Sequence, residues 1–205
     1  MDERDHELIS LSDEASAALA EFNSQRHLLD TELARIQVEA EDDFIADRQL
    51  SMDLFTEDWS KSQFWYSDET AKLFAENLIE GSSATTVIGL VSAPSVFIAL
   101  RNMLHSRKEI ERPKLVLLEH DKRFEIYSEF VNYDYREPLK LSPALKGSID
   151  RIFCDPPFLS EDCQTKAATT IRWLLKDVSA GLPRPRVVIC TGERHVLDTM
   201  SKSAE

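Results

Sequence analysis

The sequence predicts an α/β fold with a mainly parallel sheet, and three observations support this prediction. From about residue 53 onward, apolar runs of strand length alternate with segments of helical periodicity. The run from Thr85 to Val91 is apolar without alternation, which is typical of a parallel strand buried on both faces. The chain of 205 residues is 42% hydrophobic, which suits one globular domain with a modest extension.

The first part of the chain predicts one helix followed by a linker. Ser12 can cap this helix, and Asp13 and Glu14 favour its first turn. Apolar side chains then form one stripe at helical spacing, made of Leu11, Ala15, Ala18, Leu19, Phe22, Leu28, Leu29, Leu33 and Ile36. The charged stretch from Glu39 to Asp47 is interpreted as a solvated linker. We therefore expect an acidic helical extension and linker at residues 1–50, and a separate domain at residues 51–205.

The remaining elements follow from periodicity and turn residues. Proline in the first turn favours a helix that begins at Pro94, and an apolar stripe that includes Ala167 and Ile171 favours a helix from Cys163. Helices are expected over Asp68 to Ile79, Pro94 to Leu104, Phe124 to Phe130, Cys163 to Val178 and Glu193 to Met200. Strands are expected over Thr85 to Val91, Leu115 to Leu118, Val131 to Tyr135, Ile149 to Cys154 and Arg186 to Cys190.

Acidic side chains outnumber basic ones by 37 to 24, which gives a net charge of −13. Affinity for a phosphate backbone comes from cationic neutralisation, so this charge disfavours nucleic acid and an anionic membrane surface as partners. Residues 1–50 carry 14 acidic and 4 basic side chains, a net charge of −10, whereas residues 51–205 carry 23 and 20, a net charge of −3. We expect the acidic leader to be an adaptor for a basic partner and not part of a cofactor site.

The sequence gives no sign of secretion, membrane insertion or metal binding. No apolar run approaches the roughly 18 residues of a membrane span, and the acidic N-terminus lacks the apolar core of a signal peptide. The three cysteines, Cys154, Cys163 and Cys190, fit neither a disulfide framework nor a metal site, and the five histidines show no metal-ligand spacing. A cytoplasmic protein is expected, with the nucleus as the alternative.

Acids follow three successive strands of the predicted sheet. Glu119 follows the second strand, Asp134 the third and Asp155 the fourth. Ligands of parallel α/β sheets bind beyond the carboxyl ends of the strands. Asp is common in turns, so one such acid alone is weak support. Three acids at one edge of the sheet together predict a functional site.

The turn after the first strand, Ser92-Ala93-Pro94, is small but lacks the glycines that let a backbone approach a pyrophosphate. A nucleoside without phosphates therefore suits this turn better than a dinucleotide. Glu119 is placed to accept hydrogen bonds from ribose hydroxyls, with Asp121 as the second candidate and helix capping as its alternative role. Asp134 could accept from an adenine amino group or hold its own turn.

Asp155-Pro156-Pro157-Phe158 is the most specific local signal. The two prolines fix an extended backbone without amide donors, so carbonyl oxygens lie free to accept beside the carboxylate. This acceptor cluster suits a substrate amino group, with Phe158 as an apolar wall.

The tetrapeptide resembles the (D/N/S)PP(Y/F) motif of amino-directed, S-adenosylmethionine-dependent class I methyltransferases. Longer segments resemble the elongation factor 1A lysine methyltransferase family, which was first labelled as N6-adenine DNA methyltransferases. These segments are Trp59 to Ser67, Val91 to Val96, Glu119 to Phe124 and Tyr133 to Tyr135. The resemblance runs from the helix near Leu11 to Gly192, and it implies a Rossmann-like class I methyltransferase fold with S-adenosylmethionine as cofactor.

The resemblance implies a protein-lysine methyltransferase acting on elongation factor 1A. Its expected catalytic residues are Asp155, Pro156 and Phe158. Its expected cofactor-binding residues are Gln63, Tyr66, Ser92, Ala93, Pro94, Glu119, Asp121 and Asp134, of which Gln63 and Tyr66 would close over the cofactor. Members of the family continue past the fifth strand into an antiparallel strand pair that this chain lacks, so its fifth strand is expected to be an exposed edge.

Two alternative functions stay open at this point. An N6-adenine methyltransferase of DNA or RNA would need a basic groove and a base-flipping pocket, which the charge disfavours. A non-catalytic, cofactor-binding paralogue that docks on a translation factor is favoured by the missing strand pair and disfavoured by the intact acids.

Overall fold

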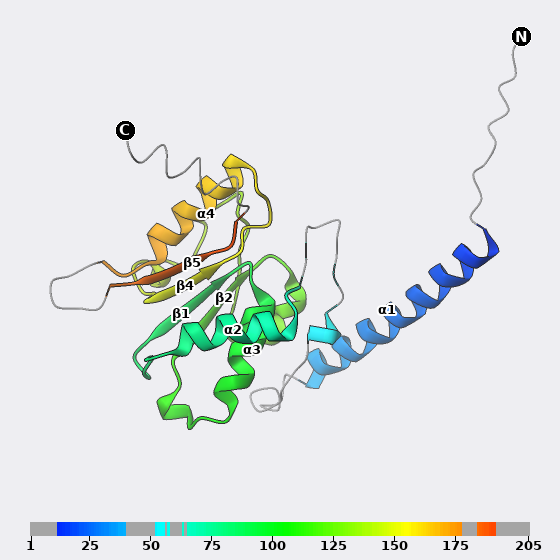
Figure 1. Ribbon diagram of the computed structural model, residues 1–205, viewed down its shortest axis with the longest axis horizontal. Coiled ribbons are helices and arrows are strands. Elements are labelled where there is room, and N and C mark those ends of the chain that lie inside the picture. Colours follow the sequence, from blue (N-terminus) through cyan, green and yellow to red (C-terminus); the bar gives the residue numbers. More distant parts are fainter. Residues whose placement is uncertain are drawn as a thin grey trace, which may run out of the picture.

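A parallel β-sheet forms the centre of the structure (Figure 1). The computed structural model describes residues 12–39, 52–55, 57, 63, 65–177 and 184–191. Within them the strands are β1 (Val87–Val91), β2 (Lys114–Glu119), β3 (Phe130–Asn132), β4 (Arg151–Cys154) and β5 (Arg186–Ile189), all parallel and in the spatial order β3-β2-β1-β4-β5. The predicted α/β fold is confirmed. The strand order reverses between β1 and β4, which is where such sheets bind their ligands.

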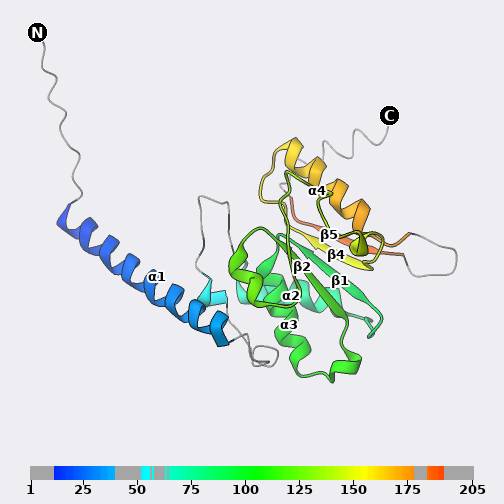
Figure 2. The same ribbon diagram turned by 180° about the vertical axis from the view of Figure 1, so that it is seen from behind.

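Helices cover both faces of this sheet (Figure 1 and Figure 2). Helices α2 (Asp68–Ile79) and α3 (Pro94–His105) pack on one face, and α4 (Glu161–Leu174) packs on the other. Strand β1 contributes side chains to the hydrophobic core on both faces of the sheet. Ile88 and Leu90 are buried with α2 and α3, whereas Val91 is buried with α4. Each fully buried side chain of this kind contributes about 1.5–3 kcal/mol to stability.

A long helix, α1 (Asp13–Glu39), extends away from the sheet (Figure 2). Ser12 caps it as predicted, since its Oγ accepts a hydrogen bond from the Ala15 N–H at 3.2 Å. Three large side chains of the apolar stripe are exposed to solvent: Leu19, Phe22 and Leu28 are 48%, 55% and 68% exposed. The helix contacts the body at two short 3-10 helices, η2 (Met52–Leu54) and η5 (Lys122–Ile126).

Several element ends differ from those expected from the sequence. The helix expected over 124–130 is the shorter η5, and the strand expected over 131–135 is β3 at 130–132, because a turn closed by the Glu137 N–H on the Asp134 carbonyl follows it. Helix α4 ends at Leu174 instead of residue 178, because Leu175 forms a parallel bridge with Ile149. The linker expected over 40–47 and the helix expected over 193–200 lie outside the described residues.

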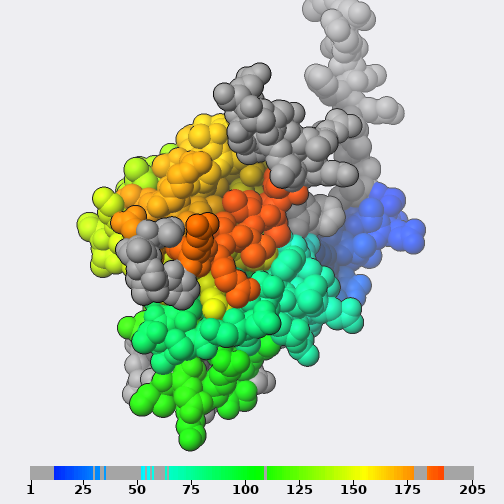
Figure 3. All heavy atoms as spheres, turned by 60° about the vertical axis from the view of Figure 1, so that its left-hand side comes forward, coloured from blue at the N-terminus to red at the C-terminus, as the bar shows by residue number. Residues whose placement is uncertain are grey.

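Within the described residues, β5 is an edge strand of the sheet, and it lies on the surface in Figure 3. Its exposure agrees with the expectation for the fifth strand: Val187 and Ile189 are 41% and 45% exposed. Arg186 donates to the carbonyl of Asn77 at 3.0 Å, and Arg151 on β4 donates to that of Leu78 at 2.6 Å. Both guanidinium groups thus satisfy carbonyls at the C-terminal end of α2. In the described part of the chain, we find no helix of the length and hydrophobicity needed to cross a membrane.

Candidate active site

A cavity of about 380 Å³ opens at the carboxyl ends of β1 to β4. Its volume lies in the range of small-molecule sites. The cavity is lined by Gln63, Trp65, Ser92, Glu119, His120, Tyr133, Asp134, Tyr135, Arg136, Asp155, Pro156, Pro157 and Phe158. The side chains come from four strand ends and from the segment that precedes α2.

The three acids predicted at one edge of the sheet all line this cavity. Glu119 is the last residue of β2, Asp155 follows β4 directly, and Asp134 lies two residues beyond β3. Among the other predicted site residues, Gln63, Ser92, Pro156 and Phe158 also line the cavity, whereas Tyr66, Ala93, Pro94 and Asp121 do not. The convergence of the acids is confirmed, and the chemical role of each residue stays a prediction.

The turn after β1 holds Ser92 in an unusual backbone conformation. Its φ of 53° lies in the left-handed region that side chains other than glycine rarely adopt. Strain of this kind gathers at functional sites. The Ser92 N–H donates to the Leu118 carbonyl at 2.9 Å, which ties the turn to β2. Ala93 and Pro94 are buried at the start of α3, so they support the turn from outside the cavity.

Glu119 is the most deeply buried acid of the cavity, with 7% of its surface exposed. Its Oε1 accepts hydrogen bonds from the backbone N–H groups of His120 at 2.8 Å and Asp121 at 3.0 Å. In the described part of the chain, its second oxygen, Oε2, makes no hydrogen bond. Burial raises the pKa of Glu119 to about 7, although the two amides oppose that shift. The residue therefore offers one oriented oxygen to a ligand hydroxyl.

The buried Glu119 predicts a pH-dependent stability of the cofactor-free protein. Because its folded pKa of about 7 exceeds the ordinary value of 4.5, its stabilising contribution is complete below 4.5 and is lost as pH rises through 7. Glu119→Gln keeps an acceptor oxygen but cannot ionise. We expect it to raise the free energy of unfolding by on the order of 3 kcal/mol above neutral pH and to leave it unchanged in acid. Urea unfolding of both proteins across the pH range tests this, and parallel pH profiles would contradict it.

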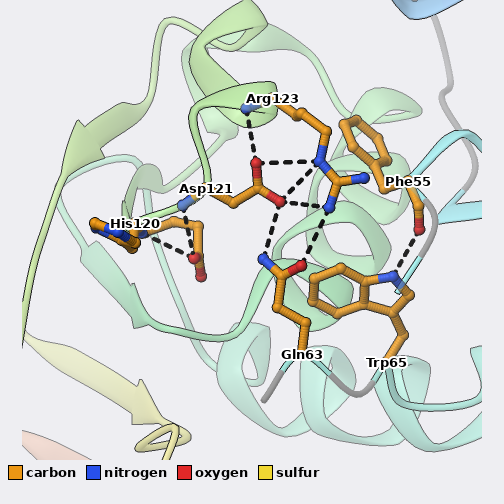
Figure 4. A network of polar contacts seen from close by, with 7 residues as sticks. Phe55, Gln63, Trp65, His120, Asp121 and Arg123 are labelled. Atoms are coloured by element: carbon orange, nitrogen blue, oxygen red, sulfur yellow. Dashed lines mark hydrogen bonds and ion pairs between the residues drawn. The ribbon is translucent and has the colours of Figure 1, made fainter. Parts of the chain in front are cut away.

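Asp121 belongs to a polar network beside the cavity (Figure 4). Its carboxylate accepts the Arg123 backbone N–H at 2.9 Å and the Arg123 Nε–H at 2.8 Å, and it accepts from Gln63 Nε2 at 2.9 Å. Burial of this carboxyl favours its neutral form, but the hydrogen bonds from Arg123 outweigh burial and hold the pKa of Asp121 below its ordinary value. The capping role considered for Asp121 is thus observed at η5. The Asp121 side chain is linked to the cavity lining through Gln63.

An aromatic wall stands next to this network. Trp65 lines the cavity, and its Nε1–H donates to the Phe55 carbonyl at 2.6 Å (Figure 4). Phe55 in turn stacks on Phe124 with ring centroids 4.3 Å apart. The indole therefore has a fixed position, set by Phe55, which directly follows η2, and by Phe124 in η5. Sequence reasoning placed Trp65 in the family segment but could not foresee this support.

Asp155 follows β4 at the opposite wall of the cavity. Its backbone N–H donates to the Val91 carbonyl at 3.0 Å, and its Oδ2 accepts a hydrogen bond from the Tyr66 hydroxyl at 2.7 Å. Burial raises the pKa of Asp155, and the bond from Tyr66 opposes that shift. Pro156, the next residue, is buried and also lines the cavity. Phe158 is 41% exposed at the mouth, where its ring packs edge-on against Tyr135 at 5.7 Å.

Asp134 has one of the two roles that the sequence left open, and the contact with an adenine amino group stays a prediction. Its Oδ1 accepts the Arg136 backbone N–H at 2.9 Å, so it does hold its own turn. The Arg136 guanidinium also contacts both carboxylate oxygens, and this pairing holds the pKa of Asp134 below its ordinary value. The side chain still lines the cavity, as a carboxylate with a fixed orientation.

Sequence reasoning gave no site role to several lining residues: His120, Tyr133, Tyr135, Arg136 and Pro157. Each lies within two residues of a predicted acid or proline. Their proximity in sequence to the predicted residues could therefore have indicated them, because two or three successive residues after a strand end border the same cavity.

Proteins with similar sequences are methyltransferases by name. A family model described as "Probable N6-adenine methyltransferase" matches residues 57–203. The chain is 41% identical over 194 residues to the protein-lysine N-methyltransferase EFM5 of Saccharomyces cerevisiae. The matched region covers 90% of this chain and 77% of that protein. It is 37% identical over 194 residues to EEF1A lysine methyltransferase 1 of Gallus gallus, covering 94% and 81% of the two chains. Identity to the Homo sapiens protein of that name is 36% over 194 residues, covering 93% and 78%.

Proposed function

This chain belongs to the elongation factor 1A lysine methyltransferase family, and we propose that it transfers a methyl group from S-adenosylmethionine to a lysine of translation elongation factor 1A. One observation carries the proposal: a single cavity joins the buried Glu119 to the Asp155-Pro156-Pro157-Phe158 turn. The names of the Gallus gallus and Homo sapiens relatives specify elongation factor 1A as their substrate.

The residues of the cavity fit S-adenosylmethionine, which when bound supplies a methyl group on a positively charged sulfur. Glu119 presents a buried acceptor oxygen that suits the ribose hydroxyls, as the acid after the second strand does in related sheets. The carboxylate of Asp134 would accept from the adenine amino group. Ser92 would supply backbone at the switch point, and Gln63, whose Nε2 donates to Asp121, would close over the cofactor.

The protein's own contribution to the reaction is orientation and exclusion of water. Asp155 and the Pro156 carbonyl would accept the N–H bonds of the lysine amine and aim its lone pair along the line of attack. The amine must be neutral to react, while a nearby carboxylate favours the ammonium form. The apolar ring of Phe158 opposes that preference, because desolvation disfavours the charged amine.

A nucleobase substrate is the second candidate, since the family model is described by N6-adenine chemistry and an acceptor cluster of this kind suits any amino group. Nucleic acid binding depends on cationic neutralisation of phosphates. The net charge of −3 over residues 51–205 and −10 over residues 1–50 disfavours it. We therefore favour a lysine substrate in the cytoplasm, where elongation factor 1A works.

The test of the proposed function is transfer of a tritiated methyl group. The purified protein is offered elongation factor 1A, DNA and RNA in parallel reactions. Label on the protein substrate alone is expected. Label on nucleic acid would favour the adenine alternative, and cofactor binding without any transfer would favour a non-catalytic paralogue.

We also propose that residues 1–50 act as an adaptor that attracts a basic protein surface. Helix α1 exposes Asp13, Glu14 and Glu21. Complementary charge mainly speeds encounter and weakens with salt. Neutralising these three acids to Asn or Gln is expected to raise KM for elongation factor 1A severalfold at low salt, with kcat and cofactor affinity unchanged. Deleting residues 1–50 should have the same effect.

A matched control neutralises three exposed acids of the body, Glu69, Glu76 and Glu80. It changes the net charge equally, so it separates a local effect of α1 from an effect of total charge. If both triple variants raise KM alike, or if the α1 variant weakens cofactor binding, the adaptor role is wrong.

A further inference from the structure

The hydroxyl of Tyr66 and the carboxylate of Asp155 are in contact although 89 residues separate them in the chain. Tyr66 Oη donates to Asp155 Oδ2 at 2.7 Å. Asp155 lines the cavity and Tyr66 does not, so the tyrosine reaches the carboxylate from outside the cavity. We propose that Tyr66 is a positioning residue, which holds Oδ2 of Asp155 and thereby directs Oδ1 toward the substrate amine.

Tyr66 has the rigidity that a positioning role requires. Its ring packs edge-on against Phe74 at 5.4 Å and against Phe153 at 6.3 Å between centroids. Its backbone N–H donates to Ser95 Oγ at 3.3 Å, and Ser95 is itself buried at the start of α3. The hydroxyl is therefore fixed by α2, α3 and β4 together, with no role for a ligand in holding it.

The bond matters because a carboxylate can otherwise rotate about its Cβ–Cγ bond. In the described part of the chain, Asp155 Oδ1 makes no hydrogen bond, so holding Oδ2 leaves Oδ1 as the oxygen available to the cavity. A small loss of alignment between reacting groups costs a large factor in rate. This inference rests on the proposed function, and it moves Tyr66 from the cofactor, where the sequence placed it, to the reacting amine.

The titratable groups around Asp155 stay uncharged at neutral pH. Burial raises the pKa of the Tyr66 phenol well above its ordinary value, so the hydroxyl stays a donor at neutral pH. The Cys190 thiol lies beside the Tyr66 hydroxyl, and Cys154 directly precedes Asp155; burial raises the pKa of both thiols, so they stay neutral. Removing the Tyr66 hydroxyl removes the hydrogen bond that opposes the raised pKa of Asp155.

Tyr66→Phe tests the proposal. Loss of a hydrogen bond to a charged group predicts kcat about tenfold to a hundredfold lower, while KM for elongation factor 1A and affinity for S-adenosylhomocysteine stay within about twofold. The acid limb of the pH–kcat profile should move to higher pH, because Asp155 loses a donor that favours its ionised form. In the Asp155→Asn background, Tyr66→Phe should cause no further loss.

Tyr127→Phe is the control, since Tyr127 is buried more deeply than Tyr66 and, in the described part of the chain, its hydroxyl has no hydrogen-bond partner. It should keep kcat and the pH profile of the unaltered protein. A Tyr66→Phe variant with unchanged kcat, or with cofactor affinity lost in proportion to kcat, would overturn the proposal. A carbon-NMR titration of the Asp155 carboxyl decides it independently of activity. If the pKa of Asp155 is unchanged in Tyr66→Phe, the positioning role is refuted. If the unaltered protein methylates nothing, that result counts only against the proposed function.

Discussion

Asp155→Ala is expected to lower turnover by a factor on the order of 10² or more while cofactor affinity stays within a few-fold of the unaltered protein. The carboxylate stands at the end of β4, its Oδ2 is held by Tyr66, and it lines the cavity beside Pro156. Alanine removes the acceptor that would aim the amine and leaves Glu119 in place. Steady-state kinetics with elongation factor 1A, together with calorimetric titration of S-adenosylhomocysteine, separate the two quantities.

Asp155→Asn distinguishes this role from a structural one. If the asparagine oxygen accepts the Tyr66 hydroxyl, its NH₂ group faces the cavity, where a donor cannot receive the N–H bonds of the amine. A strong loss of turnover is therefore expected from this nearly isosteric change. A side chain that only stabilised its own turn would tolerate asparagine with little effect. Thermal melts must accompany both variants, because only a folded, cofactor-binding protein makes the comparison meaningful.

Glu119→Ala is expected to have the second large effect, which is a loss of cofactor affinity. Loss of a buried carboxylate–hydroxyl contact costs roughly 1.5–3 kcal/mol. That cost corresponds to a Kd for S-adenosylhomocysteine about tenfold to a hundredfold higher. Calorimetry measures it directly. Asp121→Ala is the matched comparison, because Asp121 is equally buried but lies outside the cavity lining and is held by Arg123.

Alanine substitutions of Glu119 and Asp121 should differ in which properties of the protein they change as well as in how much they change them. Asp121→Ala is expected to weaken binding only through the loss of Gln63 positioning, and to lower stability by leaving the part-buried Arg123 without its main partner. If Asp121→Ala weakens the cofactor and Glu119→Ala does not, the ribose contact has been assigned to the wrong acid.

The sequence predicted best those elements whose ends are set by local chemistry. Helix α2 was predicted over the residues it occupies, because the Ser67 side chain caps it through the Thr70 N–H and two acids occupy its first turn. Segments with ends set by distant contacts were misplaced. The C-terminal end of α4 depends on a bridge to Ile149, which no local pattern reveals.

The same distinction between local signals and distant contacts applies to the candidate site. The convergence of Glu119, Asp134 and Asp155 follows from strand order alone, because the carboxyl ends of parallel strands share one edge of a sheet. The contact between Tyr66 and Asp155 joins an aromatic segment before α2 to the end of β4, and side-chain contacts across such a separation leave no periodic trace in a sequence. The same holds for the bond from Gln63 to Asp121.

The most direct test of the central claim is peptide mass spectrometry of elongation factor 1A after incubation with S-adenosylmethionine and either the unaltered protein or Asp155→Ala. One methyl group or more is expected on a lysine side chain with the unaltered protein, and background levels are expected with the variant. Equal methylation by a folded Asp155→Ala protein, or methylation that appears on nucleic acid and never on a lysine, would contradict it.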